Sequence, residues 1–266
     1  MNKKLTLLAI GFVILITSCS KSDRDEDITT SSVVDNALFE NLWIDAQSQI
    51  ENAAFEEDSL RDGDCPEVTI DLTSEPMTVT VDFGEDGCTG DDGRERKGVL
   101  LATFTGKYSE EGSVITVTPQ DYSVDGYALE GTRTVTNEGE NEDGNTWFSV
   151  SVSDAKITHP SDNWFTTWES ERTRTWVKGD DTPMNPWDDE YEIEGTAHGQ
   201  NRNGNTYEME ITSPLWVKVG CPWIVKGTLE IQPDNLSLRT IDYGNGTCNG
   251  NITVTINGVD FEVNLE

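Results

Sequence analysis

The chain has 266 residues, and its 50 Asp and Glu against 18 Lys and Arg give a formal net charge of −32. A chain this acidic repels phosphate backbones, so nucleic acid is excluded as an expected partner. Its hydrophobic content of 35% and aromatic content of 8% argue against a wholly disordered chain. The length accommodates one large all-β domain or two small ones.

The N-terminus has the pattern of an export signal followed by a cysteine. Two lysines precede an apolar run over residues 5–16, which is too short for a membrane span. The run ends Leu-Ile-Thr-Ser-Cys19, which resembles the bacterial lipobox, where a small residue precedes the lipidated cysteine. The resemblance implies a signal peptide over residues 1–18 and a lipid on Cys19. An ordinary export signal with an unrelated cysteine is the alternative.

A charged stretch follows Cys19. Residues 20–27 read Ser-Lys-Ser-Asp-Arg-Asp-Glu-Asp, which is similar to the acidic export tract of surface lipoproteins of the Bacteroidota. This resemblance implies an outer-membrane protein, lipid-anchored and exposed at the cell surface, with residues 19–34 as an acidic tether. A plain solvated tether explains the same residues.

Residues 35–64 are predicted to form one amphipathic helix and a connector. Asp35 is the expected N-cap, and Gly63 ends the segment. Apolar residues recur at steps of three and four, at Phe39, Leu42, Trp43, Ala46, Ile50, Ala53 and Ala54. We expect this helix to dock on a sheet. A partner protein or the membrane is the alternative, although the helix carries no Lys or Arg to meet an acidic lipid surface.

From residue 65 to residue 266 the apolar pattern has a period of two, which predicts one continuous β domain. At the C-terminus, a turn at Asn257-Gly258 opposes Ile256 to Val259 and Val254 to Phe261. Similar turns recur along the chain. The sequence therefore predicts an all-β antiparallel meander of about a dozen strands, which curls into an open barrel or splits into a sandwich.

Four cysteines in the β region are predicted to form two disulfides. They are Cys65, Cys88, Cys221 and Cys248. Each pair begins Cys-Pro and ends Asp-aromatic-Gly-x-x-x-Cys-x-Gly, at residues 82–90 and 242–250. Two copies of one unit predict one bridge in each, Cys65–Cys88 and Cys221–Cys248. A metal or redox site is the weaker alternative, because both use closer Cys-x-x-Cys spacing.

A second repeat places similar hairpin tips at residues 141–147 and 201–207. With the cysteine unit, this hairpin resembles all-β surface lipoproteins of the Bacteroidota, and the resemblance implies no particular activity. A two-residue turn at Asn203-Gly204 would place His198 opposite Met209, half-buried.

Catalytic motifs are weak. The chain has two histidines, His159 and His198, and no nucleophile elbow, phosphate loop or His-Glu-x-x-His motif. Glycoside hydrolysis needs only two carboxylates, but 50 acidic residues supply such pairs by chance. No catalytic residue is therefore assigned, and no cofactor is expected.

Tryptophans give the strongest indication of a ligand. Seven of the eight lie within residues 147–223, and Trp164, Trp168 and Trp176 share one strand face if the segment is extended. Aromatic rings beside Asp and Asn suit sugar rings, so these three are the candidate glycan-binding residues. Packing in the sheet core is the alternative.

Two further surface features have a chemical interpretation. Acidic loops around Cys88, with Asp86, Asp91 and Asp92, and at residues 179–190 could hold Ca²⁺, although EF-hand spacing is absent and a solvated acidic surface is the alternative. Asp58-Ser59-Leu60 resembles the short O-glycosylation acceptor of Bacteroidota, which makes Ser59 a candidate glycosylation site.

The sequence thus predicts a lipid-anchored surface protein with a non-catalytic binding or scaffolding role, with glycan as the candidate ligand. One alternative is a structural or assembly lipoprotein that contacts a membrane-protein partner through its helix or an open sheet edge. The other is a carbohydrate-active enzyme that uses carboxylates, which requires two buried, converging acids.

Overall fold

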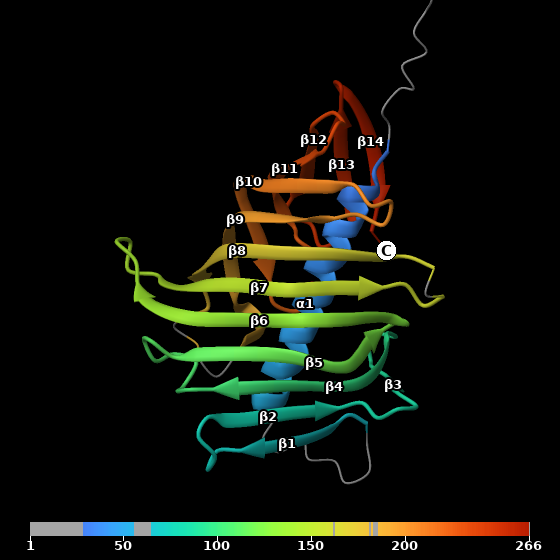
Figure 1. Cartoon of the computed structure of the whole chain (residues 1–266). Helices are drawn as coiled ribbons and strands as arrows, with labels where there is room; N and C mark the ends of the chain where they lie inside the picture. Colours follow the sequence, from blue (N-terminus) through green and yellow to red (C-terminus); the bar gives the residue numbers. More distant parts are fainter. Residues whose placement is uncertain (1–28, 56–64, 162, 181, 183–185, 266) are drawn as a thin grey trace, which may run out of the picture.

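The computed structural model describes residues 29–55, 65–161, 163–180, 182 and 186–265. Within these residues, fourteen strands form one antiparallel sheet that does not close (Figure 1). Their bounds are β1 Glu67–Asp71, β2 Met77–Asp82, β3 Cys88–Thr89, β4 Glu95–Phe104, β5 Val114–Val124, β6 Tyr127–Glu140, β7 Thr146–Thr158, β8 Phe165–Lys178, β9 Glu190–Gln200, β10 Thr206–Lys218, β11 Lys226–Pro233, β12 Arg239–Asn245, β13 Asn251–Ile256 and β14 Val259–Asn264. A short 3₁₀ turn, η1, covers Pro186–Asp188. The all-β prediction is confirmed, and the sheet takes the open form.

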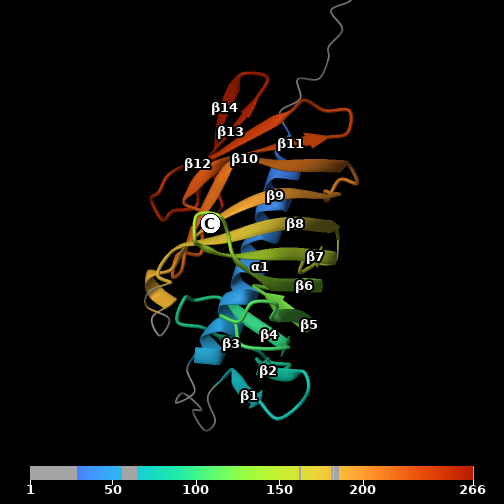
Figure 2. The ribbon, with the colours of Figure 1, turned by 90° about the vertical axis from the view of Figure 1, so that its left-hand side faces the viewer.

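The single described helix, α1, spans Ser31–Phe55 and crosses the strands on the concave side of the sheet (Figures 1 and 2). Its apolar positions are the predicted ones, since Phe39, Trp43 and Ala46 are at most 1% exposed. Ala54, by contrast, is exposed. No residue from Ser31 to Ala53 is exposed, because the curled sheet covers both flanks of the helix.

The predicted start of the helix is wrong. The helix begins at Ser31, four residues before Asp35. Residues 31–34, which were assigned to the tether, are therefore helical. The Thr29 hydroxyl oxygen accepts a hydrogen bond from the Ser31 amide and supplies the cap. Asp35 lies inside the helix, fully buried, and binds Arg202. An acidic residue before an apolar run suggested a cap, but its partner is 167 residues away.

The strand order follows the chain from β1 to β14, apart from the short β3, which pairs with β4. The predicted C-terminal register is confirmed, because Ile256 pairs with Val259 and Val254 with Phe261. β1 and β14 are left as the edges of the sheet.

Bulges curl the long central strands around α1. Gly131 in β6 and Gly195 in β9 have φ of +124° and +127°, and the register shifts beside Gly131. A Cβ on Gly195 would lie 2.2 Å from the Glu171 carbonyl oxygen, so only glycine fits there. The strands continue through these bends, so they are longer than the short apolar runs of the sequence suggest. The bends also form the trough that holds the helix.

The two repeated hairpin tips have the same hydrogen bonds. The Asn141 side-chain oxygen accepts from the amides of Asp143 and Asn145, and Asn201 accepts from Asn203 and Asn205 in the same way. The second tip is therefore longer than a two-residue turn.

This longer tip overturns the predicted position of His198. His198 pairs with Glu208, not with Met209. A shift of one residue moves a side chain to the other face of a sheet. His198 is exposed on the convex face, 3.5 Å from Glu169.

Both predicted disulfides are confirmed. Cys65 is bonded to Cys88 and Cys221 to Cys248, with a Cα–Cα distance of 5.9 Å in each. The adjoining motifs also match, since the Asp82 and Asp242 carboxylates each accept the amide of the glycine two residues later at 2.7 Å. One bridge lies in the N-terminal part of the sheet and the other in the C-terminal part, and each links segments that are near in sequence.

Candidate functional site

A groove of about 1440 Å³ lies beside the C-terminal half of α1. One wall comes from β1 and the turn between β3 and β4, and the other from β9, the end of β10 and the segment that follows it. Both disulfide units reach its rim through Cys65 and Cys221. A second hollow, beside Trp223, holds about 10 Å³, which is room for about one water molecule.

Aliphatic side chains cover much of the groove walls. They are Ile44 on the helix, Val68, Ile70 and Leu72 in and after β1, Ile193 in β9, and Val217 and Val219 in and after β10. Trp187 stands at the rim, 61% exposed, and its ring lies against Gly220. An exposed indole and an aliphatic interior are typical features of a binding site.

Acidic residues along the whole of α1 form ion pairs with arginines of the surrounding strands and turns. All four carboxylates of the helix take part. The pairs are Asp35 with Arg202, Glu40 with Arg172 at 2.5 Å, Asp45 with Arg94 and Arg96, and Glu51 with Arg174 at 3.5 Å. These contacts fix the helix in the trough. The sequence indicates that the helix needs cationic partners, since it has four acidic residues and no basic one.

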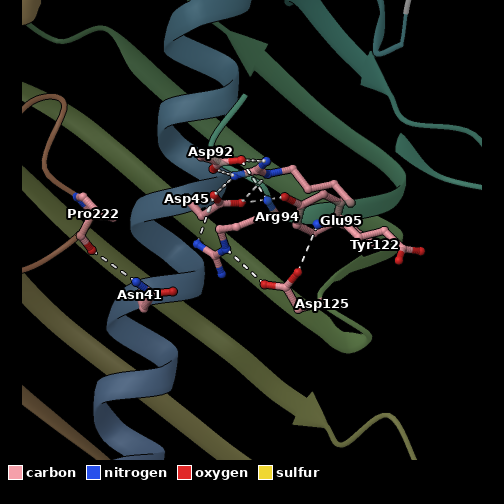
Figure 3. Close-up of polar contacts among 9 residues, drawn as sticks. Asn41, Asp45, Asp92, Arg94, Glu95, Tyr122, Asp125 and Pro222 are labelled. Atoms are coloured by element: carbon pink, nitrogen blue, oxygen red, sulfur yellow. Dashed lines mark hydrogen bonds and ion pairs between the residues drawn. The ribbon is translucent and has the colours of Figure 1, made fainter. Parts of the chain in front are cut away.

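Asp45 is the most connected of these acids (Figure 3). It accepts hydrogen bonds from Arg96 Nε at 3.1 Å, Arg94 Nη1 at 3.2 Å and the Tyr122 hydroxyl at 2.9 Å. Asp92 also binds Arg96, at 3.0 Å. Burial lowers the pKa of Arg96, but its hydrogen bonds to Asp92 and Asp45 outweigh burial and raise that pKa overall.

Asn41 extends the fastening of α1. Its side-chain amide donates to the Pro222 carbonyl oxygen at 3.1 Å, so the segment after β10 is held against the helix (Figure 3). The groove thus has walls that disulfides, ion pairs and hydrogen bonds hold in place.

Arg133 differs from the other arginines that face α1. It lies in β6 between Val117 and Val152, on the concave side, and lines the groove. It makes no hydrogen bond or ion pair with any residue that the structure describes, and its Nε is buried. Burial, and then the charge of Arg174, lower the pKa of Arg133 to about 10. The guanidinium remains protonated at neutral pH and has an unmet need for an anion.

Arg174 is already engaged. Its guanidinium carbon lies 3.6 Å from the Tyr191 ring centroid, and its side chain pairs with Glu51. Arg133 is therefore the one guanidinium of the described groove lining without an ion pair; Lys218, at the end of β10, also lines the groove and forms no ion pair with a described residue.

The three candidate tryptophans do not form a glycan platform. Trp168 is 3% exposed, stacks on Phe39 at 5.4 Å and donates to Asn36. It is a core residue, which corrects its assignment as a ligand contact. Its parity was read correctly, because Trp168 and Arg172 both face the helix.

Trp164 and Trp176 lie at opposite ends of β8. Trp164 is half-buried, with the Arg202 guanidinium 4.1 Å from its ring. Trp176 is half-buried against Tyr191 and donates to the Lys178 carbonyl oxygen. Twelve extended residues span about 40 Å, so one sugar cannot contact both rings.

Asp189 is the one described carboxyl whose pKa is raised, to about 6, and burial is the main cause. The Tyr191 hydroxyl donates to it at 3.2 Å. The adjacent Glu190 has a lowered pKa, because Lys178 binds it. The enzyme alternative requires two buried, converging acids with shifted pKa values. Among the described acids Asp189 is the one with a raised pKa, and the lowered pKa of Glu190 comes from its ion pair with Lys178.

The acidic loops bind other parts of the protein. Asp92 pairs with Arg96, and Asp188 accepts from the Thr182 hydroxyl at 3.0 Å. Among the described residues, no three His, Cys, Asp or Glu side chains are grouped to hold a metal ion. Cys19, Ser59 and Asp181 lie outside the described residues.

Asp35 and Arg133, which matter most for the helix and the groove, were missed as interacting residues. Their partners, or the lack of one, depend on strands far away in the sequence. Of the described helices, none has the length and hydropathy needed to cross a membrane. Comparison with protein-family models, curated proteins and solved structures finds no match to this chain.

Proposed function

We propose that this chain is a lipid-anchored cell-surface protein with a non-catalytic binding role, and that its ligand occupies the groove beside α1. The observation that carries the proposal is the groove itself. Its volume of about 1440 Å³ exceeds that of typical small-molecule sites. It combines an aliphatic part, which can bury apolar carbon, with many polar and charged side chains that can orient a ligand.

The disulfides and ion pairs that hold the groove walls in place support a binding role. Walls that are already in place lower the entropy cost of ordering on association. The Cys65–Cys88 and Cys221–Cys248 bridges stand at the rim, and Glu51 pairs with Arg174 beside it.

The position of the proposed anchor agrees with access to the groove. A lipid on Cys19 would lie before the N-terminal end of α1, while the groove lies at the C-terminal half. The groove begins at Asn41, ten residues after the helix start at Ser31, so about 15 Å of helix separates it from the anchored end.

The alternative of an assembly lipoprotein has fewer contact surfaces than the sequence suggested. The helix has no exposed residue between Ser31 and Ala53, so outside the groove it presents no apolar face to a partner. The edge strands β1 and β14 remain as the surfaces that a partner strand could extend.

Trp187 provides a direct test of groove binding, because it is exposed at the rim. The oxidised chain, residues 28–266, is titrated with a panel of neutral and acidic polysaccharides, alkyl alcohols and alkyl acids while indole emission is recorded. A saturable shift that disappears in Trp187→Phe but persists in Trp147→Phe supports the proposal. A panel without any saturable shift, or a shift that Trp187→Phe retains, contradicts it.

A further inference from the structure

We infer that the groove binds an amphipathic carboxylate, an alkyl chain that ends in one acidic group, and that Arg133 binds this group. The inference rests on the proposed binding function and names the class of its ligand. Three observations carry it: the unpaired guanidinium of Arg133, the aliphatic lining of the groove, and the pairing of neighbouring cations.

The first observation is the state of Arg133. Arg133 is half-buried with its Nε out of contact with water, and the charges of Glu51 and Glu40 act on it without forming an ion pair; an arginine in such a place is normally paired. Arg172 and Arg174, on the same concave side, are paired with Glu40 and Glu51. Arg133 has no such partner among the described residues. Its planar fork of donors suits a carboxylate, which it can bind through two parallel hydrogen bonds.

The second observation is the chemistry of the walls. Ile44, Ile70, Ile193 and Val217 offer saturated carbon on the sides of the groove. The lining also has amide and hydroxyl groups that could bind a sugar, but a sugar ring stacks on aromatic faces, and Trp187 is the single aromatic residue among the described lining residues. An alkyl chain gains by leaving water for such walls, at about 0.8 kcal/mol for each buried CH₂.

The third observation sets the number of charges. Arg94 and Arg96 also line the groove, but Asp45 and Asp92 neutralise them. Lys218 lines the far wall without an ion pair, so Arg133 is the one unpaired guanidinium, and its fork of donors matches one carboxylate. The protein as a whole carries a net charge of −32, which disfavours ligands with several negative charges.

The test uses dodecanoate as the probe, below its micelle concentration, with dodecanol and acetate as matched ligands. Affinity is measured by calorimetry on the wild-type chain and on Arg133→Met. We expect dodecanoate to bind the wild type and acetate not to bind. Arg133→Met should weaken dodecanoate binding about tenfold or more and leave dodecanol binding unchanged, because only the carboxylate contact is lost.

Two further variants separate a lost contact from a damaged fold. Lys156→Met removes one positive charge from the convex face, where Lys156 pairs with Glu130, and should leave dodecanoate affinity unchanged. Arg133→Lys keeps the charge and loses the fork, and should give an intermediate affinity. Circular dichroism checks that each variant is folded.

Equal affinity for dodecanoate and dodecanol in the wild type would overturn the inference, as would unchanged dodecanoate affinity in folded Arg133→Met. A wild-type chain that does not bind dodecanoate, but whose Trp187 emission responds to another member of the panel, would overturn the carboxylate and leave the binding function standing. Failure of every ligand would overturn both.

Discussion

Single residues decide how firmly α1 is held in the sheet. Asp45 accepts hydrogen bonds from Arg94, Arg96 and Tyr122, and it is buried with them. A buried network of this kind contributes little when it is complete, but it is costly to break. The same reasoning explains why Arg133, without a partner, is a cost to the folded protein unless an anion binds.

Asp45→Ala should lower the free energy of unfolding by about 3–5 kcal/mol, because it leaves buried guanidinium groups unpaired. Glu130→Ala serves as the matched control, since Glu130 pairs with Lys156 from an exposed position, and its loss should cost less than about 1 kcal/mol. Urea unfolding followed by circular dichroism measures both values. Equal losses in the two variants would show that the buried network is not the fastening point.

Arg133→Met should leave the free energy of unfolding unchanged or raise it by up to about 1 kcal/mol, since it replaces a half-buried charge without an ion pair by an apolar side chain. The measurement is urea unfolding in the absence of added ligand. A loss of stability comparable to that of Asp45→Ala would mean that Arg133 has a structural partner.

Asp189 predicts a pH dependence of stability. Burial raises its folded-state pKa from 3.8 to about 6, so the neutral form is favoured in the folded protein. Its contribution is complete below pH 3.8 and is lost as the pH rises through about 6. Stability of the wild type relative to Asp189→Asn should therefore fall between these values. A difference between the two chains that is independent of pH would contradict this assignment.

At the scale of elements, hairpin geometry decides what the sequence reveals. The β13–β14 register was predicted correctly because a two-residue Asn-Gly turn leaves one pairing. The β9–β10 register was predicted one residue out, because Asn201 organises a longer tip. The apolar stripe of α1 was also read correctly, whereas its start depends on Thr29 and on the distant Arg202.

Gly195→Ala tests the role of the bulges in curling the sheet. A Cβ there would collide with the backbone of β8, so we expect a loss of at least about 2 kcal/mol in the free energy of unfolding. Gly144→Ala is the matched control, because it also has positive φ but nothing lies within 4 Å of the added carbon. It should cost only about 1 kcal/mol. Similar losses would show that the bulge is not a tight contact.

At the scale of the whole molecule, an open antiparallel sheet curls around one helix and leaves a groove between its two ends. The β class and both disulfides follow from sequence patterns, because periodicity and repeats are local. The groove does not, since β1 and the end of β10 lie about 150 residues apart and meet only through the curl. For the same reason Trp168 was taken for a ligand contact when it fills the core.

Hydrogen–deuterium exchange of the oxidised chain, residues 28–266, with and without a saturating ligand from the titration, tests the location of binding most directly. The account predicts slower exchange in β1 and in residues 217–222, the walls of the groove, and no change in the β13–β14 hairpin, which contributes no lining residue. Protection confined to the β13–β14 hairpin would contradict the claim that the groove beside α1 is the binding site.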